Sequence, residues 1–331
     1  MTAPETRVVS ARPAAPVDLS VLSLVTTPEV ASYADQLRAL SELGVETTVL
    51  SATGDGDGDC PKSRSDGDAR RLAAGVVDRP LGEYDLLHAN HGRTGAAALA
   101  QTDLPVVLSL WASERRAGDG VSSRHAASRA DAVVVPSEAM GQALDRDYEV
   151  IPRGVDLDRV RPQPPGEARA AVGWDDDARH VVQPALSSEG RGVHDLTAEA
   201  VEAAERRLGE PVDLHTLDRR VPYGERAIYL SAADAMVLPS RSERSSTAAA
   251  EAMACNLPVV ATDDCDVAGR LAAVEPSPVC GSASAVPGAL VEVLRRGERS
   301  TGRAYARELH TERTAWRVLG VYRDVLDLDS A

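Results

Sequence analysis

Two carboxylates and a group of hydroxyls stand close together within residues 232–262, at a spacing that could hold a polar, anionic ligand. Glu243 and Glu251 lie eight positions apart, and Ser245, Ser246 and Thr247 stand between them. Hydroxyl side chains of this kind cap helix starts, where backbone N–H groups attract anions. Carboxylates accept hydrogen bonds from hydroxyl groups. The combination indicates a ligand with a phosphate and several hydroxyls, such as a sugar nucleotide.

The flanking residues indicate which elements position these side chains. Residues 235–238 and 259–261 are short apolar runs, typical of strands in a parallel sheet that is covered on both faces. Between them we expect a short loop with Glu243 and then a helix that begins at Ser245 to Thr247. Glu251 falls about two turns along that helix. The stretch therefore predicts one βαβ unit.

This stretch resembles the donor-binding signature of retaining glycosyltransferases with the GT-B fold, in the large family numbered four. The signature is a strand ending in Pro-Ser, two glutamates separated by seven residues, and a segment Ala-Met-Ala-Cys-Gly-x-Pro-Val-Val-Ala-Thr. The chain has Pro239 and Ser240, the glutamate pair, and the same segment with Asn256 in place of the glycine. The resemblance implies that Glu243 meets the donor sugar and Glu251 the nucleotide ribose.

Two further arginines stand where the family has functional motifs. Arg153 lies in Ile-Pro-Arg-Gly-Val-Asp, which resembles an Ile-Pro-Asn-Gly-Val-Asp signature near the end of the first domain. Arg191, in Glu-Gly-Arg-Gly, stands at the position of a lysine that grips the donor diphosphate, and the family's other cation is absent. An arginine can clamp a phosphate with two donors. The resemblance implies that Arg191, Arg153 and the helix start at Ser245 to Thr247 stabilise the leaving diphosphate.

Three aromatic or imidazole side chains follow predicted strands of the first half of the chain. His88 is either a cleft residue or a hydrogen-bonded core histidine, and His91, beside Gly92, is the better cleft candidate. Trp111 stands where the family often has a histidine that touches the donor sugar. It is either a stacking platform or a core residue.

The predicted fold class is α/β, a GT-B arrangement of two doubly wound, Rossmann-like domains facing a cleft. Residues 1–160 are expected to form the N-terminal, acceptor-side domain, and the proline-rich residues 161–167 a linker. Residues 168–310 should form the nucleotide-sugar domain, and residues 311–331 a helix that crosses back to the first domain. No further strand and helix fit between residues 217 and 229, so we expect the second domain to lack one βα unit of the family.

The composition is strongly acidic and almost free of lysine. The 331 residues have 51 acidic and 36 basic side chains, a formal charge of −15, and Lys62 as the sole lysine. We interpret this surface as that of a protein from a halophilic archaeon, because salt screens its repulsion. The alternative is an acidic protein from a GC-rich genome. Either composition argues against a nucleic-acid partner, which requires a basic face.

Other sequence features bear on location and metal binding. The four cysteines show no zinc-ligand spacing and favour a reducing, cytoplasmic setting. Residues 1–18 contain no leader-like apolar run, and no stretch approaches the ~20 apolar residues of a membrane span, so the protein is expected to be at most peripheral to a membrane. No metal motif such as Asp-x-Asp occurs at a predicted strand end.

These features lead to one main functional hypothesis and two alternatives. The main hypothesis is a metal-independent retaining glycosyltransferase without a cofactor, which moves a sugar from a nucleoside-diphosphate sugar to a glycan or lipid-linked acceptor. Arg191 and Glu243 would be its catalytic residues. The first alternative is a non-catalytic descendant that binds a nucleotide sugar, and the second is a sugar-nucleotide epimerase on the same fold. The donor, the acceptor and the linkage stay open.

Overall fold

A computed structural model describes most of the chain, namely residues 17–26, 31–52, 66–110, 120–185, 190–218, 221–238, 243–263 and 267–328. Within these ranges the side chains of residues 31, 66–68, 120–122, 190–194 and 243–245 are not described.

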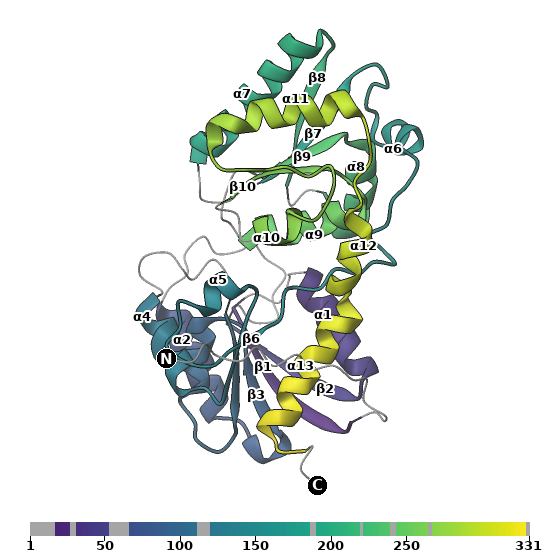
Figure 1. Cartoon of the computed structure of the whole chain (residues 1–331). Helices are drawn as coiled ribbons and strands as arrows, with labels where there is room; N and C mark the ends of the chain where they lie inside the picture. Colours follow the sequence, from purple (N-terminus) through teal and green to yellow (C-terminus); the bar gives the residue numbers. More distant parts are fainter. Residues whose placement is uncertain are drawn as a thin grey trace. The chain divides into compact units, whose positions relative to one another are not determined.

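The chain folds into two compact units (Figure 1). Unit 1 holds residues 1–154 and 311–331, and unit 2 holds residues 155–310. The division follows Gly154 and so comes earlier than the proline-rich segment 161–167, which the sequence pattern placed between two domains. That segment belongs to unit 2 because it runs into helix α6 (Pro165–Val172), whose proline at the first position suits a helix start.

Unit 1 is built on a six-stranded parallel sheet in the order β2-β1-β3-β4-β5-β6. Its central strands are short apolar runs, as expected where both faces of a sheet are covered. The strands are β1 (Leu19–Val25), β2 (Val45–Ser51), β3 (Leu86–Ala89), β4 (Val106–Ser109), β5 (Ala132–Val135) and β6 (Glu149–Val150).

Helices cover both faces of this sheet (Figure 1). Neighbouring residues of a strand point to opposite faces. Val21 therefore packs in a core with α1 and α13, whereas Leu22 packs in a core with α2, α3 and α4. The C-terminal helix α13 thus belongs to unit 1, where it contacts α1. The helices are α1 (Ala31–Glu42), α2 (Asp66–Val77), α3 (Gly92–Ala98), α4 (Gly120–Arg129), α5 (Glu138–Gly141) and α13 (Thr311–Val325).

Unit 2 is built on a five-stranded parallel sheet in the order β11-β10-β9-β7-β8. Val181 of β7 packs in a core with α7 and α11, and Val182 packs on the other face with α8 and α9. The strands are β7 (Arg179–Pro184), β8 (Val212–Leu217), β9 (Ala235–Leu238), β10 (Val259–Thr262) and β11 (Val279–Cys280). The helices after α6 are α7 (Gly190–Leu208), α8 (Arg226–Ala232), α9 (Glu243–Ala254), α10 (Ala268–Leu271), α11 (Val286–Arg296) and α12 (Gly302–Ala306).

Two parallel α/β units with helices on both sheet faces confirm the predicted fold class of two doubly wound domains. Between β8 and α8 the described residues form only one 3-10 turn, Tyr223–Glu225. That part of the described chain therefore adds no strand to the sheet, in agreement with the sequence.

Asn256 ends α9 at the position where the sequence signature has a glycine. Its φ of 53° lies in the left-handed region, which asparagine tolerates better than other residues with side chains. Its side-chain oxygen accepts a hydrogen bond from the Arg303 backbone N–H at 2.9 Å, and its carbonyl accepts one from the Ser300 N–H at 2.8 Å. The asparagine therefore keeps the helix end of the signature and also ties it to α12.

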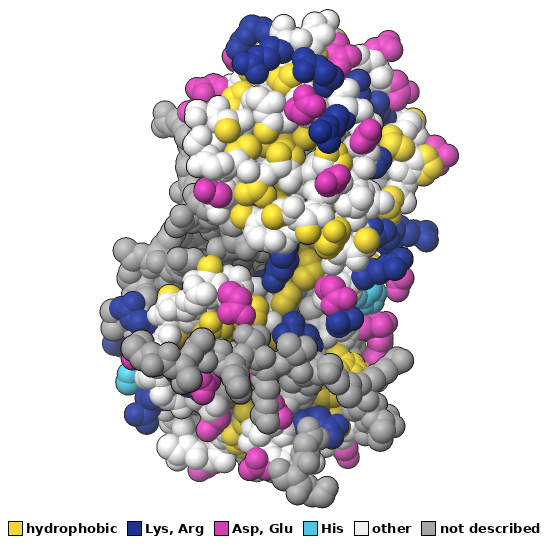
Figure 2. All heavy atoms as spheres, viewed as in Figure 1, with side chains coloured by type: hydrophobic (Ala, Val, Ile, Leu, Met, Phe, Trp, Pro, Cys, Tyr) yellow, Lys and Arg dark blue, Asp and Glu magenta, His cyan; other side chains and the backbone are white. Residues whose placement is uncertain are grey.

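The face drawn in Figure 2 has basic and acidic side chains interspersed over its described part. A protein that binds a phosphate backbone instead presents a continuous basic face. The distribution on this face thus offers no such surface among the residues that the structure describes.

Candidate functional site

The site predicted from the sequence falls at a distinctive place in the sheet of unit 2. Strand β7 pairs with β8 on one side and with β9 on the other. The chain runs from β7 to β8 and then crosses back to β9, so the order reverses between β7 and β9. Open α/β sheets bind ligands outside the carboxyl ends of their strands at such a switch point. The candidate ligand site therefore lies beyond Pro184 and Leu238, where β7 and β9 end.

Two helices begin next after these two strand ends. Helix α7 begins at Gly190, after residues 186–189, and α9 begins at Glu243, after residues 239–242. A helix start presents backbone N–H groups and the positive end of the helix dipole. Because β7 and β9 are parallel neighbours, both helix starts follow strand ends on one edge of the sheet. This edge suits an anionic group.

One expectation about this region is wrong. Glu243 lies in the first turn of α9, and not on a loop before it, and Ser245, Ser246 and Thr247 lie inside that turn or the next. Serine and threonine favour the capping position, which made Ser245 to Thr247 the apparent helix start. A glutamate in a first turn is also favourable, because it faces the positive end of the helix dipole.

Glu251 is the one predicted donor-binding carboxylate whose side chain the structure describes. It lies in the third turn of α9 and is 3% exposed. Nη1 of Arg226, the first residue of α8, donates to its two oxygens at 3.1 and 3.3 Å. A carboxylate in a helix otherwise rich in buried alanines needs such a partner, since an isolated buried charge is very unfavourable.

The charge of Glu251 is set by two opposing effects. Burial is the larger effect and raises the pKa of Glu251 above its ordinary value, while the charge of Arg226 and its hydrogen bonds oppose that rise. The Nε of Arg226 is buried and has no hydrogen-bond partner in the described part of the chain. The guanidinium carbon of Arg226 lies 5.8 Å from the Tyr223 ring centroid, and that of Arg159 lies 5.3 Å from the same ring. The sequence pattern missed Arg226, which stands 25 positions before its partner and outside any motif.

Several predicted residues lie outside the described side chains. Trp111 lies in the range 111–119, which is not described at all. Arg191 and Glu243 lie in the first turns of α7 and α9, where the backbone alone is described, and the same holds for Ser245. Ser246 and Thr247 are half-buried in α9.

The predicted residues of the first half of the chain lie in unit 1. Nη1 of Arg153 donates to the Ser32 hydroxyl in α1 at 3.2 Å. His91 is half-buried at the start of α3, just after β3, and β3 pairs with β1 where the strand order of this sheet reverses. His91 thus lies at the switch point of unit 1. Its carbonyl accepts hydrogen bonds from the Gly95 N–H and the Thr94 hydroxyl.

His88 is a core histidine, which was one of its two sequence readings. It is 2% exposed, and its ring nitrogens lie 2.6 Å from the Tyr322 hydroxyl and 2.8 Å from the Ser109 hydroxyl. Burial lowers the pKa of His88 from 6.5 to about 4. The imidazole is therefore neutral near pH 7 and ties β3 to β4 and to α13.

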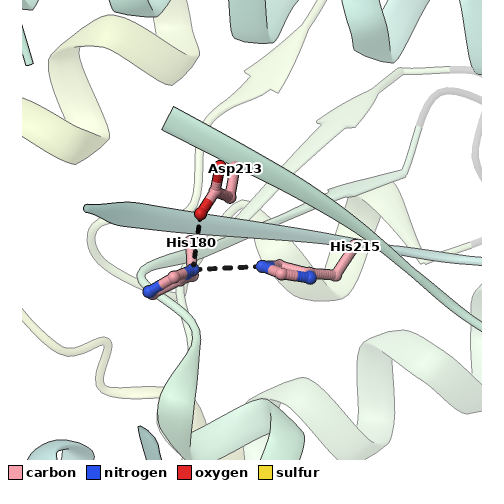
Figure 3. A group of neighbouring side chains, drawn as sticks. All are labelled: His180, Asp213 and His215. Carbon is pink, nitrogen blue, oxygen red and sulfur yellow. Dashed lines mark hydrogen bonds and ion pairs between the residues drawn. The ribbon is translucent and has the colours of Figure 1, made fainter. Parts of the chain in front are cut away.

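Another group of side chains, of the types that bind metal ions, lies toward the amino ends of two strands of unit 2. His180, near the amino end of β7, meets Asp213 and His215 of β8 (Figure 3). The sequence showed no metal motif here, because the three residues come from two strands.

Among the described residues, no helix is long and apolar enough to cross a membrane.

Two protein-family models match separate parts of the chain. The model for glycosyltransferase family 4 matches residues 31–159, within unit 1 except for its last residues. The model for glycosyl transferases group 1 matches residues 190–294, within unit 2. The second match contains α7 and α9, the helices that begin at the candidate site.

Curated proteins match at lower coverage. D-inositol 3-phosphate glycosyltransferase 2 of Catenulispora acidiphila is 28% identical in an alignment 234 residues long, with a coverage of 54% of this chain and 55% of that protein. The putative teichuronic acid biosynthesis glycosyltransferase TuaC of Bacillus subtilis is 29% identical in an alignment 226 residues long, with a coverage of 59% of this chain and 58% of that protein. The chain thus spans a little over half the length of these relatives.

Solved structures match nearly the whole chain. Sucrose-phosphate synthase from Thermosynechococcus elongatus is similar with a TM-score of 0.71 at 18% identity, covering 94% of this chain and 100% of that one. Anabaena HepE in complex with UDP-glucose has a TM-score of 0.64 at 17% identity, covering 92% and 100%. At these identities the structural likeness shows the fold. The fold is that of the GT-B glycosyltransferases, and the two family models support a glycosyltransferase of the group 1 and family 4 type.

Proposed function

We propose that this chain is a retaining glycosyltransferase that moves a sugar from a nucleoside-diphosphate sugar to a hydroxyl of a glycan or lipid-linked glycan. The observation that carries the proposal is the edge of the unit 2 sheet at the switch point. Two helix starts follow neighbouring strand ends there, and one of the two helices holds the buried carboxylate of Glu251. HepE, which shares the fold, was solved with UDP-glucose.

The diphosphate of the donor would lie at the starts of α7 and α9. Both helix dipoles place partial positive charge there, and Arg191 in the first turn of α7 adds a full charge. In the reaction, the bond between the sugar C1 and the diphosphate oxygen breaks while the acceptor oxygen bonds to C1 on the same face. The acceptor proton passes to the departing phosphate. Negative charge grows on the diphosphate, so preorganised donors aimed at it are the main catalytic device. The proposal requires no metal ion.

Glu251 would accept hydrogen bonds from the ribose hydroxyls. The ionised form accepts these hydrogen bonds most strongly, and burial alone would favour protonation. Arg226 opposes that effect with two hydrogen bonds to the carboxylate. We therefore assign Arg226 as a positioning residue that favours the ionised form of Glu251 and fixes the direction of its carboxylate.

The remaining predicted residues would contact other parts of the ligands. Glu243, in the first turn of α9, would meet the donor sugar hydroxyls, and Ser245, Ser246 and Thr247 would contribute hydroxyls and N–H groups to the diphosphate. Arg153 of unit 1 would bind the donor, and His91 and Trp111 of the same unit are the candidates for further ligand contacts. His91 has the strongest position of these, at the switch point of its own sheet.

The proposal is tested by release of nucleoside diphosphate from a panel of donors. Each donor is incubated with an acceptor extract of glycans and lipid-linked glycans, with wild type and with Arg191→Ala. Losing one preorganised donor should lower turnover by on the order of 10²–10³. Arg206→Ala is the matched control, because Arg206 lies near the other end of α7 and pairs with Glu202 on the surface.

The outcomes separate the three hypotheses. Equal release by wild type and Arg191→Ala would remove Arg191 from the mechanism. Binding of nucleotide sugars by wild type without release from any donor would favour the non-catalytic descendant. Conversion of the donor sugar into an epimer, without transfer, would favour the epimerase. Release should also be independent of added Mg²⁺.

A further inference from the structure

The three side chains His180, Asp213 and His215 converge on one face of the unit 2 sheet. His180 of β7 and Asp213 of β8 are direct partners in the parallel register, and His215 follows Asp213 by two positions. Residues two apart on a strand share a face. Nδ1 of His180 lies 3.0 Å from Nε2 of His215 and 3.8 Å from a carboxylate oxygen of Asp213 (Figure 3).

The hydrogen bonds of His180 determine its tautomer. Its Nε2 lies 2.7 Å from the backbone carbonyl of Asp175, an acceptor only, so Nε2 carries the proton and donates. Nδ1 of the neutral ring therefore accepts a hydrogen bond from Nε2–H of His215 at 3.0 Å, and an ion can bind both nitrogens once the proton of His215 moves to that ring's Nδ1. A histidine that binds a metal through one ring nitrogen commonly donates from the other to a carbonyl or carboxylate, and this contact orients the ring.

The surroundings also hold the two imidazoles in place and leave one side open. The Trp174 ring stacks on His215, with centroids 3.7 Å apart and planes 12° apart, and on His180 at 4.8 Å and 30°. His180 has no exposed surface, whereas the side chain of Asp213 is 55% exposed. Solvent therefore reaches the cluster from the Asp213 side, where an ion could enter and keep a water ligand.

We propose that His180, Asp213 and His215 form a binding site for Zn²⁺ or a chemically similar divalent transition-metal ion. Imidazole nitrogens suit zinc, copper and nickel, whereas Mg²⁺ and Ca²⁺ require sites made mainly of oxygens. Two ligands on a tetrahedral zinc, each at ~2.0–2.1 Å, are about 3.3 Å apart. The observed 3.0 and 3.8 Å bracket that value, so small ring movements would admit the ion.

The site is separate from the proposed donor site and does not rest on it. His180 and Asp213 stand second in β7 and β8, at the amino ends of strands whose carboxyl ends face the donor edge. A bound ion would join edge strand β8 to β7 and, through the Asp175 carbonyl, to the segment that follows α6. Its expected effect is to stabilise unit 2, since an ion that binds only the folded state favours folding.

The first test is a zinc titration of the full chain, without a purification tag and after treatment with a chelator. Wild type should bind one Zn²⁺ per chain and melt at a higher temperature with Zn²⁺ but not with Mg²⁺. His215→Ala and Asp213→Asn should each weaken zinc binding at least about tenfold, because even outer-sphere partners contribute that much. His125→Ala is the control, an exposed histidine of α4 in unit 1 that should leave zinc binding unchanged.

A second readout uses the stacked indole. Cu²⁺ or Ni²⁺ bound beside His215 should quench the fluorescence of Trp174, and the quenching should disappear in Trp174→Phe and in Asp213→Asn. Asp213→Asn changes a half-exposed side chain and is expected to fold, so it keeps the test interpretable if His215→Ala does not. The proposal is overturned if wild type binds no zinc, or if the variants bind zinc as wild type does, which would place the ion on other ligands such as thiols. In that case the cluster is a hydrogen-bonded histidine pair.

Discussion

Glu251 shows how much of a functional residue a local pattern can reveal. The spacing from Glu243 and the helical context placed it on α9, and the structure agrees. Its burial and its pairing with Arg226 were not predictable, because the arginine comes from a separate helix with no motif around it. The general signal was available, since a glutamate among small apolar residues needs a cation. The identity of that cation required the fold.

Asn256 replaces a glycine of the sequence signature, and the structure explains this replacement by the local backbone and its contacts. The sequence alone left open whether replacing the glycine alters the ligand. The left-handed backbone and the contact with Arg303 account for asparagine at this helix end. A substitution there therefore bears on the stability of the α9–α12 connection.

His88 gives a pH prediction at the residue scale. Its pKa of about 4 in the folded state lies below its ordinary 6.5, so the unfolded chain binds its proton first as the pH falls. The free energy of unfolding should therefore decrease between pH 6.5 and 4, by up to about 3 kcal/mol from this residue. Denaturant unfolding of wild type and of His88→Gln across this range isolates the contribution, since the carboxylates are common to both.

The prediction is checked by the sign of the difference in the free energy of unfolding between wild type and His88→Gln. Wild type should lose stability relative to His88→Gln toward pH 4, because glutamine does not titrate. Parallel pH profiles for the two proteins would mean that His88 is protonated in the folded state as readily as in the unfolded one.

At the scale of elements, one hydrogen-bonding arrangement recurs at the amino ends of the strands. Asp85, Asp131 and Asp234 each stand just before a strand, and each accepts a hydrogen bond from a backbone N–H of a neighbouring strand. The acceptors and donors are Asp85 and Ser20 at 2.7 Å, Asp131 and Val106 at 2.7 Å, and Asp234 and His180 at 2.8 Å. Asp234, which precedes β9 in the predicted donor-binding stretch, therefore has a structural role, and Arg169 also binds it.

Removing such an aspartate should cost stability. In Asp131→Ala the N–H of Val106, which is 4% exposed, loses its acceptor, so the free energy of unfolding should fall by about 1–2 kcal/mol. Asp131→Asn keeps an acceptor oxygen and should lose less. Asp145→Ala is the control, because Asp145 is an exposed carboxylate of the same unit. Chemical denaturation measures all three, and a loss no larger than in the control would show that the contact does not stabilise the sheet.

Strands were easier to predict than helix boundaries, for a physical reason. The apolar runs at 235–238 and 259–261 mark strands because both sheet faces are buried, and the structure places β9 and β10 there. The start of α9 was predicted two residues late, since both a capping serine and a first-turn glutamate favour a helix start. The cluster of His180, Asp213 and His215 could not be predicted from the sequence, because only the register of β7 with β8 brings His180 next to the other two residues.

For the whole molecule, the sequence predicted two α/β domains and a C-terminal helix that returns to the first domain. The structure shows two parallel sheets, and the C-terminal helix α13 belongs to unit 1. The division itself falls after Gly154, where a Cβ would lie 2.6 Å from the Thr314 hydroxyl and 2.8 Å from the Thr311 Cα. This close approach explains the glycine of the Ile-Pro-Arg-Gly-Val-Asp segment. No sequence pattern showed which helix requires it.

The net charge yields a prediction about salt. With 51 acidic side chains and a formal charge of −15, repulsion is weakly screened at 0.01 M salt, where the Debye length is ~30 Å, and strongly screened at 1 M, where it is ~3 Å. We expect the melting temperature to rise by about 5–10 °C between 0.01 and 1 M KCl, equivalent to roughly 2–3 kcal/mol. NaCl at equal ionic strength should act alike. A melting temperature that does not change with salt would contradict the halophilic interpretation.

The central claim is that a nucleoside diphosphate binds at the switch-point edge of unit 2, with its ribose on Glu251. Calorimetric titration of UDP, GDP and ADP into wild type, Glu251→Gln and Glu251→Ala tests it most directly. Glu292→Ala, at an exposed position of α11 in the same unit, is the control. Circular dichroism verifies that each variant is folded. A hydrogen bond to a charged group contributes on the order of 1.5–3 kcal/mol, so one nucleotide should bind wild type and the control equally and Glu251→Ala roughly ten- to a hundredfold more weakly. Equal affinity in the folded Glu251 variants, or no binding of any of the three nucleotides to wild type, would contradict the claim.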